Sequence, residues 1–222
     1  MVYRDSGLLR FIDREAAGRE LARRYEGRRQ DLLILGIPRG GLAVGMALAQ
    51  ALDAELDVIV TRKLPVPWSP ELGFGAIAPD GSISLNPEVL DVVGLRDNDI
   101  SEIASEVLEE VKRREQVYRG ERPFPGVARR NVVIVDDGLA TGYTMIAAIN
   151  MLRNMELAWL GVAIPVGPAD TVETIRRMTD YLLCPIIAGG APFAVASYYE
   201  DFHDMNDAEV IDYLERARKA SG

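Results

Sequence analysis

The segment from Val132 to Thr144 constrains the fold of this chain more than any other. Four consecutive β-branched apolar residues, Val132 to Val135, predict a short parallel strand that is covered on both faces. Asp136 and Asp137 follow directly, and a loop of small and hydroxylic residues leads into an apolar pattern of helical period from Met145 to Met155. This order predicts an α/β fold with a ligand site at the carboxyl end of the strand.

The loop suits a phosphate, whereas the two acids do not. Unpaired backbone N–H groups, threonine hydroxyls and the positive end of a helix dipole favour an anion. Asp136 and Asp137 would repel that anion, so we expect them to accept hydrogen bonds from a sugar diol or to hold Mg2+ directly or through water. The alternative is that the acids only complement the helix dipole, which leaves their place before the loop unexplained.

These residues resemble the phosphoribosyl-pyrophosphate (PRPP) signature of type I phosphoribosyltransferases. The resemblance covers about Asp31 to Pro185 and implies that Asp136 and Asp137 contact the ribose hydroxyls, with Mg2+ bound through PRPP. It assigns the 5'-phosphate to Gly138, Leu139, Ala140, Thr141, Gly142, Tyr143 and Thr144. Gly138 departs from the family, which more often has an apolar residue there, and we expect it to loosen the packing of the loop.

Two further predicted strands end in cations. The strand Leu32 to Leu35 runs through a tight turn into a helix from about Leu42 to Leu52, and the strand Leu56 to Val60 ends beside Arg62 and Lys63. Ligands of an open parallel sheet bind outside the carboxyl ends of its strands, so these charges are expected to converge on one rim, although solvated strand-end charges are the alternative. The resemblance assigns the pyrophosphate to Pro38, Arg39, Gly40, Gly41, Arg62 and Lys63. It makes Asp136, Asp137, Arg62 and Lys63 the catalytic set.

The remaining pattern alternates between strands and helices. Further strands are predicted at 159–164 and 181–187, and helices at 14–25 (a surface helix with Asp13 as N-cap), 99–118 (with Asp99 and Glu102 as a capping box), 169–178 and 207–217. We therefore expect an open, mainly parallel twisted sheet with helices on both faces. The chain is expected to form one domain, 1–222, with its core at about 31–187.

The stretch 64–79 contains four prolines and little periodicity, which predicts a long loop. Together with a hairpin of 75–77 and 82–85, it resembles the flexible loop (about 64–85) that closes over the active site in the family. A lid of this kind would keep water from the activated sugar. Trp68 and Phe74 would either cover the substrate or pack under the loop.

The end of the chain, about 188–222, is expected to form a hood that selects the acceptor. Residues 192–203, here called the aromatic segment, hold Phe193, Tyr198, Tyr199, Phe202 and the one histidine, His203. Tyr198 and Tyr199 could stack on an acceptor base, or the segment could pack on the sheet or make a dimer contact. His203 is not expected to be a catalyst, because no partner motif points to it.

Composition excludes several other classes. A net charge of −9 argues against general nucleic-acid binding, and one cysteine, Cys184, excludes an intramolecular disulfide and is expected to be buried. No apolar run approaches the ~18 residues of a membrane helix, so a cytoplasmic protein without a membrane partner is expected. Dimers are frequent in the resembled family, so the resemblance allows a homodimer, although the sequence does not determine the oligomeric state.

The implied reaction is transfer of ribose 5-phosphate from Mg-PRPP to a nitrogenous acceptor, such as a nucleobase or a related small molecule, with release of pyrophosphate. The alternative is a regulatory protein that senses PRPP or a nucleotide and catalyses nothing. A kinase or dehydrogenase is disfavoured, because the phosphate loop lacks a Walker A lysine and no Gly-x-Gly-x-x-Gly follows a strand.

Overall fold

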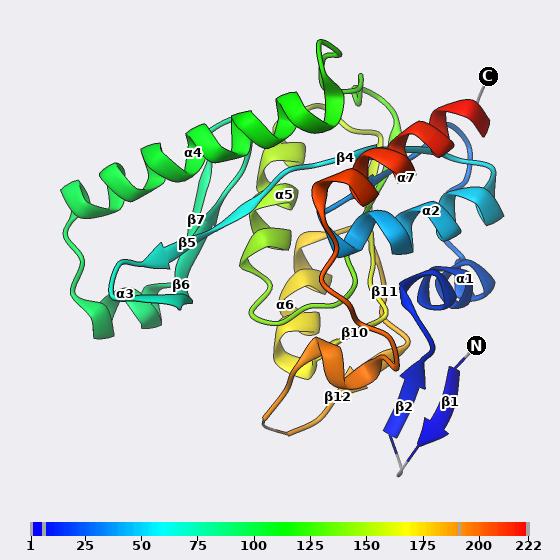
Figure 1. Cartoon of the computed structure of the whole chain (residues 1–222), viewed down its shortest axis with the longest axis horizontal. Coiled ribbons are helices and arrows are strands. Elements are labelled where there is room, and N and C mark those ends of the chain that lie inside the picture. The colour runs from blue at the N-terminus through cyan, green and yellow to red at the C-terminus, as the bar shows by residue number, and fades with distance from the viewer. Residues whose placement is uncertain (1, 6–7, 191, 221–222) are drawn as a thin grey trace.

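The computed structural model describes residues 2–5, 8–190 and 192–220, and for residues 2–5 and 8–9 it describes the backbone alone (Figure 1). The strands are β1 (Val2–Asp5), β2 (Leu8–Phe11), β3 (Leu32–Gly36), β4 (Glu55–Val58), β5 (Arg62–Val66), β6 (Ser69–Ile77), β7 (Ile83–Leu85), β8 (Asn131–Val135), β9 (Trp159–Ala163), β10 (Val166–Pro168), β11 (Tyr181–Leu183) and β12 (Ile186–Ala188). The helices are α1 (Arg14–Arg24), α2 (Gly40–Leu52), α3 (Pro87–Val93), α4 (Asp97–Arg119), α5 (Tyr143–Arg153), α6 (Ala169–Met178), α7 (Asp207–Ala220) and the 3-10 helix η1 (Val195–Tyr198).

A five-stranded parallel sheet, in the order β11-β9-β8-β3-β4, forms the centre of the molecule. Successive residues of β3 face opposite sides, as the geometry of a strand requires. Ile34 packs in a cluster with apolar residues of α1, α2 and α7, whereas Leu33 and Leu35 pack with α5 and α6. Figure 1 shows α5 and α6 on one side of this sheet and α1 and α2 on the other. The predicted fold class is confirmed.

A second, three-stranded antiparallel sheet replaces most of the expected loop. Its order is β5-β6-β7, and it includes the predicted hairpin, in which Gly75 pairs with Leu85. The expectation of irregular structure over 64–79 is wrong for 64–66 and 69–74, which lie in β5 and β6, whereas 75–77 form the expected strand of the hairpin. Prolines misled the prediction because β5 is an edge strand whose register shifts at Pro65, and edges and bulges tolerate proline.

The two ends of the chain pack against each other. Phe11 at the end of β2 forms a bridge with Tyr199, and the amides of Glu200 and Asp201 donate to the carbonyls of Phe11 and Ile12, each at 2.9 Å. The rings of Phe11 and Tyr199 are both buried, with centroids 5.5 Å apart. The aromatic segment is therefore held by the N-terminal strand.

Several predicted boundaries are confirmed or shifted by a few residues. Asp13 caps α1, accepting from the amide of Ala16 at 2.6 Å, and Asn206 forms a reciprocal cap with Glu209 before α7. For α4 the N-cap is Arg96, and Asp99 is the third helical residue, whose carboxylate accepts from the Arg96 amide at 3.0 Å.

The predicted strand 181–187 is two short strands. β11 joins the central sheet beside β9, while β12 pairs with β10 in a separate two-stranded sheet. Cys184 lies between them and is partly exposed rather than buried, with its thiol donating to the carbonyl of Ile186 at 3.3 Å. Among the described residues, no helix is long and apolar enough to cross a membrane.

Candidate functional site

Two strand-to-helix loops touch at the carboxyl rim of the central sheet. β3 and β8 are neighbours, with Gly36 beside Val135, and the amide of Ile37 donates to the carbonyl of Val135 at 2.8 Å. A Cβ on Gly40, at the start of α2, would lie 1.9 Å from Oδ2 of Asp137. The loop before α2 and the acids after β8 therefore belong to one site, and a side chain on Gly40 would force the Asp137 and Arg14 side chains to move.

The acid pair lies in a recess where charge is poorly solvated. Burial raises the pKa of Asp136 well above its ordinary value, and the adjacent charge of Asp137 raises it further. Burial also raises the pKa of Asp137, although the Arg14 guanidinium opposes the shift. Among the described residues, no cation forms an ion pair with Asp136. A hydroxyl donor or a cation from a ligand would stabilise its charged form.

Arg14 is a member of this site that the sequence pattern did not reveal. Its Nε donates to Oδ2 of Asp137 at 2.8 Å, and its Nη1 donates to the carbonyl of His203 at 2.9 Å. Its guanidinium carbon lies 3.9 Å from the centre of the Phe202 ring. The sequence pattern did not reveal Arg14, because its helix was predicted to lie at the surface. In the structure Arg14 is buried at the positive end of α1, where a cation is unfavourable unless it has a partner.

The aromatic segment supports the acid loop from the outside. The hydroxyl of Tyr199 donates to the carbonyl of Asp137 at 2.6 Å. A Cβ on Gly138 would lie 2.6 Å from Cγ1 of Val195 and 3.1 Å from Cγ1 of Val166. The expectation that Gly138 loosens the loop is therefore wrong, because Val195 fills the space that a side chain would need.

The predicted 5'-phosphate loop leads into the first turn of α5. Ala140 and Thr141 are exposed, while Leu139 is buried and anchors the loop through a hydrogen bond from its amide to the carbonyl of Val166 at 2.9 Å. Gly142 is in the left-handed region, with φ of 80°, and a Cβ there would lie 2.6 Å from Cγ2 of Thr171. Tyr143 and Thr144 open the helix, where amides have no carbonyl partner within the helix. The loop thus presents amides and a helix dipole to solvent.

The predicted pyrophosphate cations separate into two groups. Arg39 follows Pro38 across a cis peptide bond, and its Nη1 donates to the carbonyl of Met205. Burial lowers the pKa of Arg62, and so do the charges of Arg114, Arg113 and Arg39, while Glu110 opposes the shift. Arg62 also pairs with Glu110 at 3.8 Å. Lys63 points elsewhere, since its ammonium donates to the carbonyl of Glu71 at 2.6 Å.

The four aromatic residues expected at an acceptor do not gather in one pocket. Phe74 is fully buried in the same hydrophobic cluster as Val66 and Val107, so it has no face for a ligand. Tyr199 is buried between Phe11 and Phe202, and its hydroxyl is used by Asp137. The expectation that Phe74 and Tyr199 line an acceptor pocket is therefore wrong, because both side chains are buried.

The other two aromatic residues are accessible but lie in different elements. Trp68 is 65% exposed at the turn between β5 and β6, beside a cavity lined by residues of α4 such as Ile103. Tyr198 is partly exposed, with its ring 5.5 Å from that of Phe193.

The acids fit Mg2+ that arrives with a phosphate ligand. Carboxylate oxygens are its preferred protein donors, and Mg2+ is usually held by one or two carboxylates plus substrate phosphates and water. No group of three or more histidine, cysteine or acidic side chains that could cage a metal is found in the described part of the chain. Asp136 and Asp137 are the residues that would hold Mg2+, with phosphates of a ligand completing its coordination.

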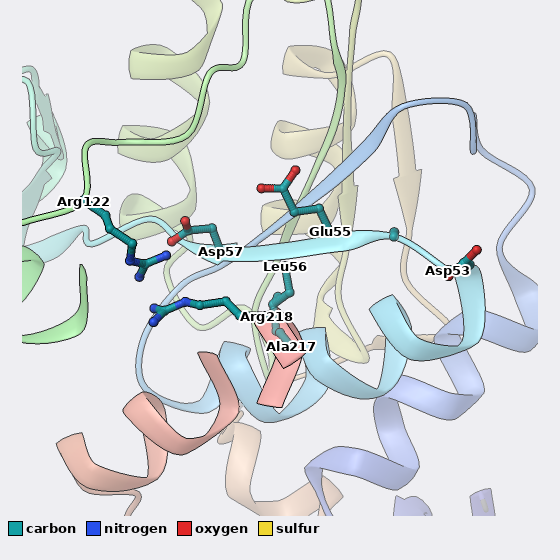
Figure 2. A pocket seen from close by; sticks show the side chains of 8 residues that line it. Asp53, Glu55, Leu56, Asp57, Arg122, Ala217 and Arg218 are labelled. Atoms are coloured by element: carbon teal, nitrogen blue, oxygen red, sulfur yellow. The ribbon is translucent and has the colours of Figure 1, made fainter. Parts of the chain in front are cut away.

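A cavity lies away from this site, along the outer edge of β4, and is here called the edge cavity (Figure 2). It measures about 540 Å³, and Figure 2 shows Asp57, Arg122 and Arg218 pointing toward the same space. Asp57 pairs with Arg119 at 3.2 Å, and Glu55 pairs with Arg130 at 2.8 Å. These acids are therefore already neutralised, unlike Asp136.

Comparison with known proteins shows which family this chain resembles. Residues 78–199 match the phosphoribosyl transferase domain. The crystal structure of TT1426 from Thermus thermophilus is similar, with 32% identity and a TM-score of 0.77 over 93% of this chain and 98% of that one.

Curated relatives point the same way. Two proteins from Mycobacterium tuberculosis strains, whose names contain the words phosphoribosyl transferase, are each 38% identical over 210 residues, which is 94% of this chain. The chain spans about half the length of these relatives, 47%. Because the matched domain covers more than half of its 222 residues, the chain belongs to the phosphoribosyltransferase family.

Proposed function

We propose that this chain binds Mg-PRPP at the carboxyl rim and transfers its ribose 5-phosphate to a nitrogenous acceptor, releasing pyrophosphate. The observation that carries the proposal is the contact between the two loops, in which a Cβ on Gly40 would lie only 1.9 Å from the Asp137 carboxylate. Two partly buried acids thereby lie beside the loop that carries Arg39. A sugar that carries a diphosphate on C1 needs acceptors for its diol and cations for its diphosphate close together.

Each part of PRPP has a matching group. Asp136 and Asp137 would accept hydrogen bonds from the ribose 2' and 3' hydroxyls, which would relieve the desolvation that raises their pKa values. The exposed amides at the start of α5 would bind the 5'-phosphate, and Gly142 in the left-handed region shapes that turn. Amides of the Arg39–Gly41 loop would face the diphosphate.

The reaction breaks the bond between C1 of the ribose and the pyrophosphate oxygen and forms a bond from C1 to the acceptor nitrogen, which then loses its proton. Negative charge grows on the leaving diphosphate, and Arg39 and Arg62 would stabilise it electrostatically. Mg2+, when bound with PRPP, supplies further neutralisation of the diphosphate. The two carboxylates would also stabilise the positive charge that develops on the sugar ring. We assign Lys63 no direct contact, because its ammonium is held by Glu71.

The identity of the acceptor stays a prediction at the level of a nucleobase or a related small molecule. Tyr198 is the aromatic side chain of the aromatic segment that we propose for stacking, because it is partly exposed while Tyr199 is buried. Closure of the β5–β6 hairpin as a lid, a homodimer and a cytoplasmic location are likewise predictions.

The test is a titration of the purified chain with Mg-PRPP, followed by an assay of pyrophosphate release with a panel of purines, pyrimidines and related amides. Binding together with release in the presence of one acceptor is the expected result and would identify the substrate. Binding with no release from any acceptor would favour a PRPP sensor. Absence of binding would show that the loops have been misinterpreted.

A further inference from the structure

The first turn of α1 reaches the rim because two helices pack unusually closely. A Cβ on Gly18 would lie 2.3 Å from the carbonyl oxygen of Val44 and 2.8 Å from Cβ of Ala47, so α1 rests directly on the backbone of α2. Arg14 is four residues before Gly18, and Gly40 is four residues before Val44. One helical turn back from the close contact, Arg14 is therefore beside the start of α2, where the acids lie.

Placing an arginine there is unfavourable for the helix itself. The positive end of a helix dipole disfavours a cation, and the Arg14 side chain is only 9% exposed. The packing of α1 on α2 is made by small and apolar residues such as Gly18 and Leu21, so it does not explain an arginine here. Its stabilising partners all belong to the site and to the aromatic segment.

One guanidinium joins three parts of the molecule. Nε binds Oδ2 of Asp137, Nη1 binds the carbonyl of His203, and the plane lies against the Phe202 ring. A Cβ on Gly40 would also lie 2.8 Å from Nε, so the ion pair sits directly over the loop assigned to pyrophosphate. Arginine suits this position because its planar fork offers several donors in fixed directions while its face stacks on a ring.

We propose that Arg14 is a positioning residue of the PRPP site. Its guanidinium fixes the Asp137 carboxylate in the orientation that receives the ribose diol and fastens the aromatic segment over the acids. This role rests on the proposed function, since it assumes that Asp137 binds the sugar. The N-terminal helix is then part of the substrate site and not only a cover for the sheet.

The experiment compares Arg14→Met, Arg14→Lys and Arg19→Met in the full chain. Arg19 is the matched control, because it lies on the same helix with a 57% exposed side chain and forms only long ion pairs, at 3.9 Å to Asp13 and 3.5 Å to Glu15. Affinity for Mg-PRPP is measured by calorimetry. Hydrogen exchange of residues 199–205, measured without ligand, reports whether Arg14 holds the aromatic segment in place.

We expect Arg14→Met to weaken PRPP binding by about tenfold or more, as when one partner of a buried ion pair is removed. Hydrogen exchange of residues 199–205 should become faster in Arg14→Met. Arg14→Lys should recover part of the affinity, because an ammonium can reach Asp137 but cannot also stack and bind His203. Arg19→Met should match the wild type in both measurements.

Unchanged or tighter PRPP binding by Arg14→Met would overturn the proposal, and tighter binding would mean that Arg14 competes with the sugar for Asp137. Failure of the wild type to bind PRPP would be a different result, because it would refute the proposed function itself. If Arg14→Met does not fold, Arg14→Lys and Phe202→Leu decide. Wild-type affinity and wild-type exchange in both of these variants would overturn the proposal.

Discussion

Two buried arginine–aspartate pairs in this molecule have similar geometry and different surroundings. Arg119 and Asp57 meet at 3.2 Å beside the edge strand β4, and Arg14 and Asp137 meet at 2.8 Å where β8 ends. At the edge, Arg119 also binds Glu115 and the carbonyl of Val58 and lies over the Phe124 ring at 4.8 Å.

The acid at the edge therefore has its partner, and the arginine covers a carbonyl that an edge strand would leave unpaired. At the rim, the cation pairs with Asp137, while the neighbouring second acid, Asp136, whose pKa burial has raised, has no ion-pair partner among the described residues. A buried pair whose neighbouring acids all contact a cation is part of the scaffold, whereas a pair beside an acid with no cation of its own is suited to a ligand. The edge cavity, of about 540 Å³, lies beside the matched pair and not beside Asp136, so the presence of a cavity does not locate the acid that lacks a partner.

The largest expected effect is on the edge pair. Arg119→Met leaves Asp57 buried without its cation and the Val58 carbonyl without its donor. We expect a loss of about 3–5 kcal/mol in the free energy of unfolding, measured by denaturant titration. Arg122→Met, on an exposed side chain nearby, is the control and should change stability by less than about 0.5 kcal/mol. Equal effects of the two substitutions would show that the edge pair is not structural.

The second prediction concerns the acid at the rim that has no ion-pair partner among the described residues. Asp136→Asn keeps an oxygen that can accept from the Asp137 amide, now 2.8 Å away, but removes a charge that is costly in this recess. Affinity for Mg-PRPP should fall about a hundredfold, roughly 2.7 kcal/mol, while stability at neutral pH stays equal or rises. Calorimetry and thermal melting measure the two quantities. A variant that loses binding together with stability would place Asp136 in the scaffold beside Asp57.

A smaller effect is the pH dependence that distinguishes the two regions. Because burial raises the pKa of Asp136 in the folded protein, the folded state binds more protons than the unfolded state between that pKa and the ordinary value of about 3.9. This contribution to stability grows as the pH falls and is lost as the pH rises through the folded pKa. The stability advantage of Asp136→Asn over the wild type should therefore shrink from pH 8 toward pH 4, roughly the interval in which carboxylates titrate.

The measurement is denaturant unfolding at several pH values in buffer with a chelator, so that no cation binds the acids. The Arg119→Met protein serves as a comparison, since its deficit comes from a different region of the molecule. An advantage for Asp136→Asn that is constant with pH would contradict a raised pKa.

The sequence predicted those parts of the site that lie on consecutive residues. Asp136, Asp137 and the loop to Thr144 follow one strand, so period and residue type were enough to place them at a rim. Arg39 could be placed there too, because neighbouring parallel strands end at the same edge. Lys63 could not, since β5 begins a second sheet and turns its side chain toward Glu71.

Groups that reach the site from far along the chain were missed. Arg14 is 123 residues from Asp137, and its helix has an ordinary amphipathic pattern. Phe74 shows the opposite error. It was expected to be accessible to a substrate because it lies near an expected loop, but it is on a strand and its side chain is buried in the core. Both errors have one cause, namely that a periodic pattern reports which face of an element is apolar but not which other element packs on it.

The smallest predicted effect is at the support of the acid loop. The hydroxyl of Tyr199 donates to the carbonyl of Asp137 at 2.6 Å, and its ring is buried, so Tyr199→Phe leaves that carbonyl without this donor while the packing is unchanged. We expect a loss of about 1 kcal/mol in stability and a change of less than about threefold in PRPP affinity, because the carboxylate keeps its bond to Arg14. Tyr198→Phe, one residue earlier and partly exposed, is the control and should have no effect on stability. If Tyr199→Phe reduced affinity as strongly as Arg14→Met, the orientation of the Asp137 side chain would depend on its backbone support and not on its ion pair.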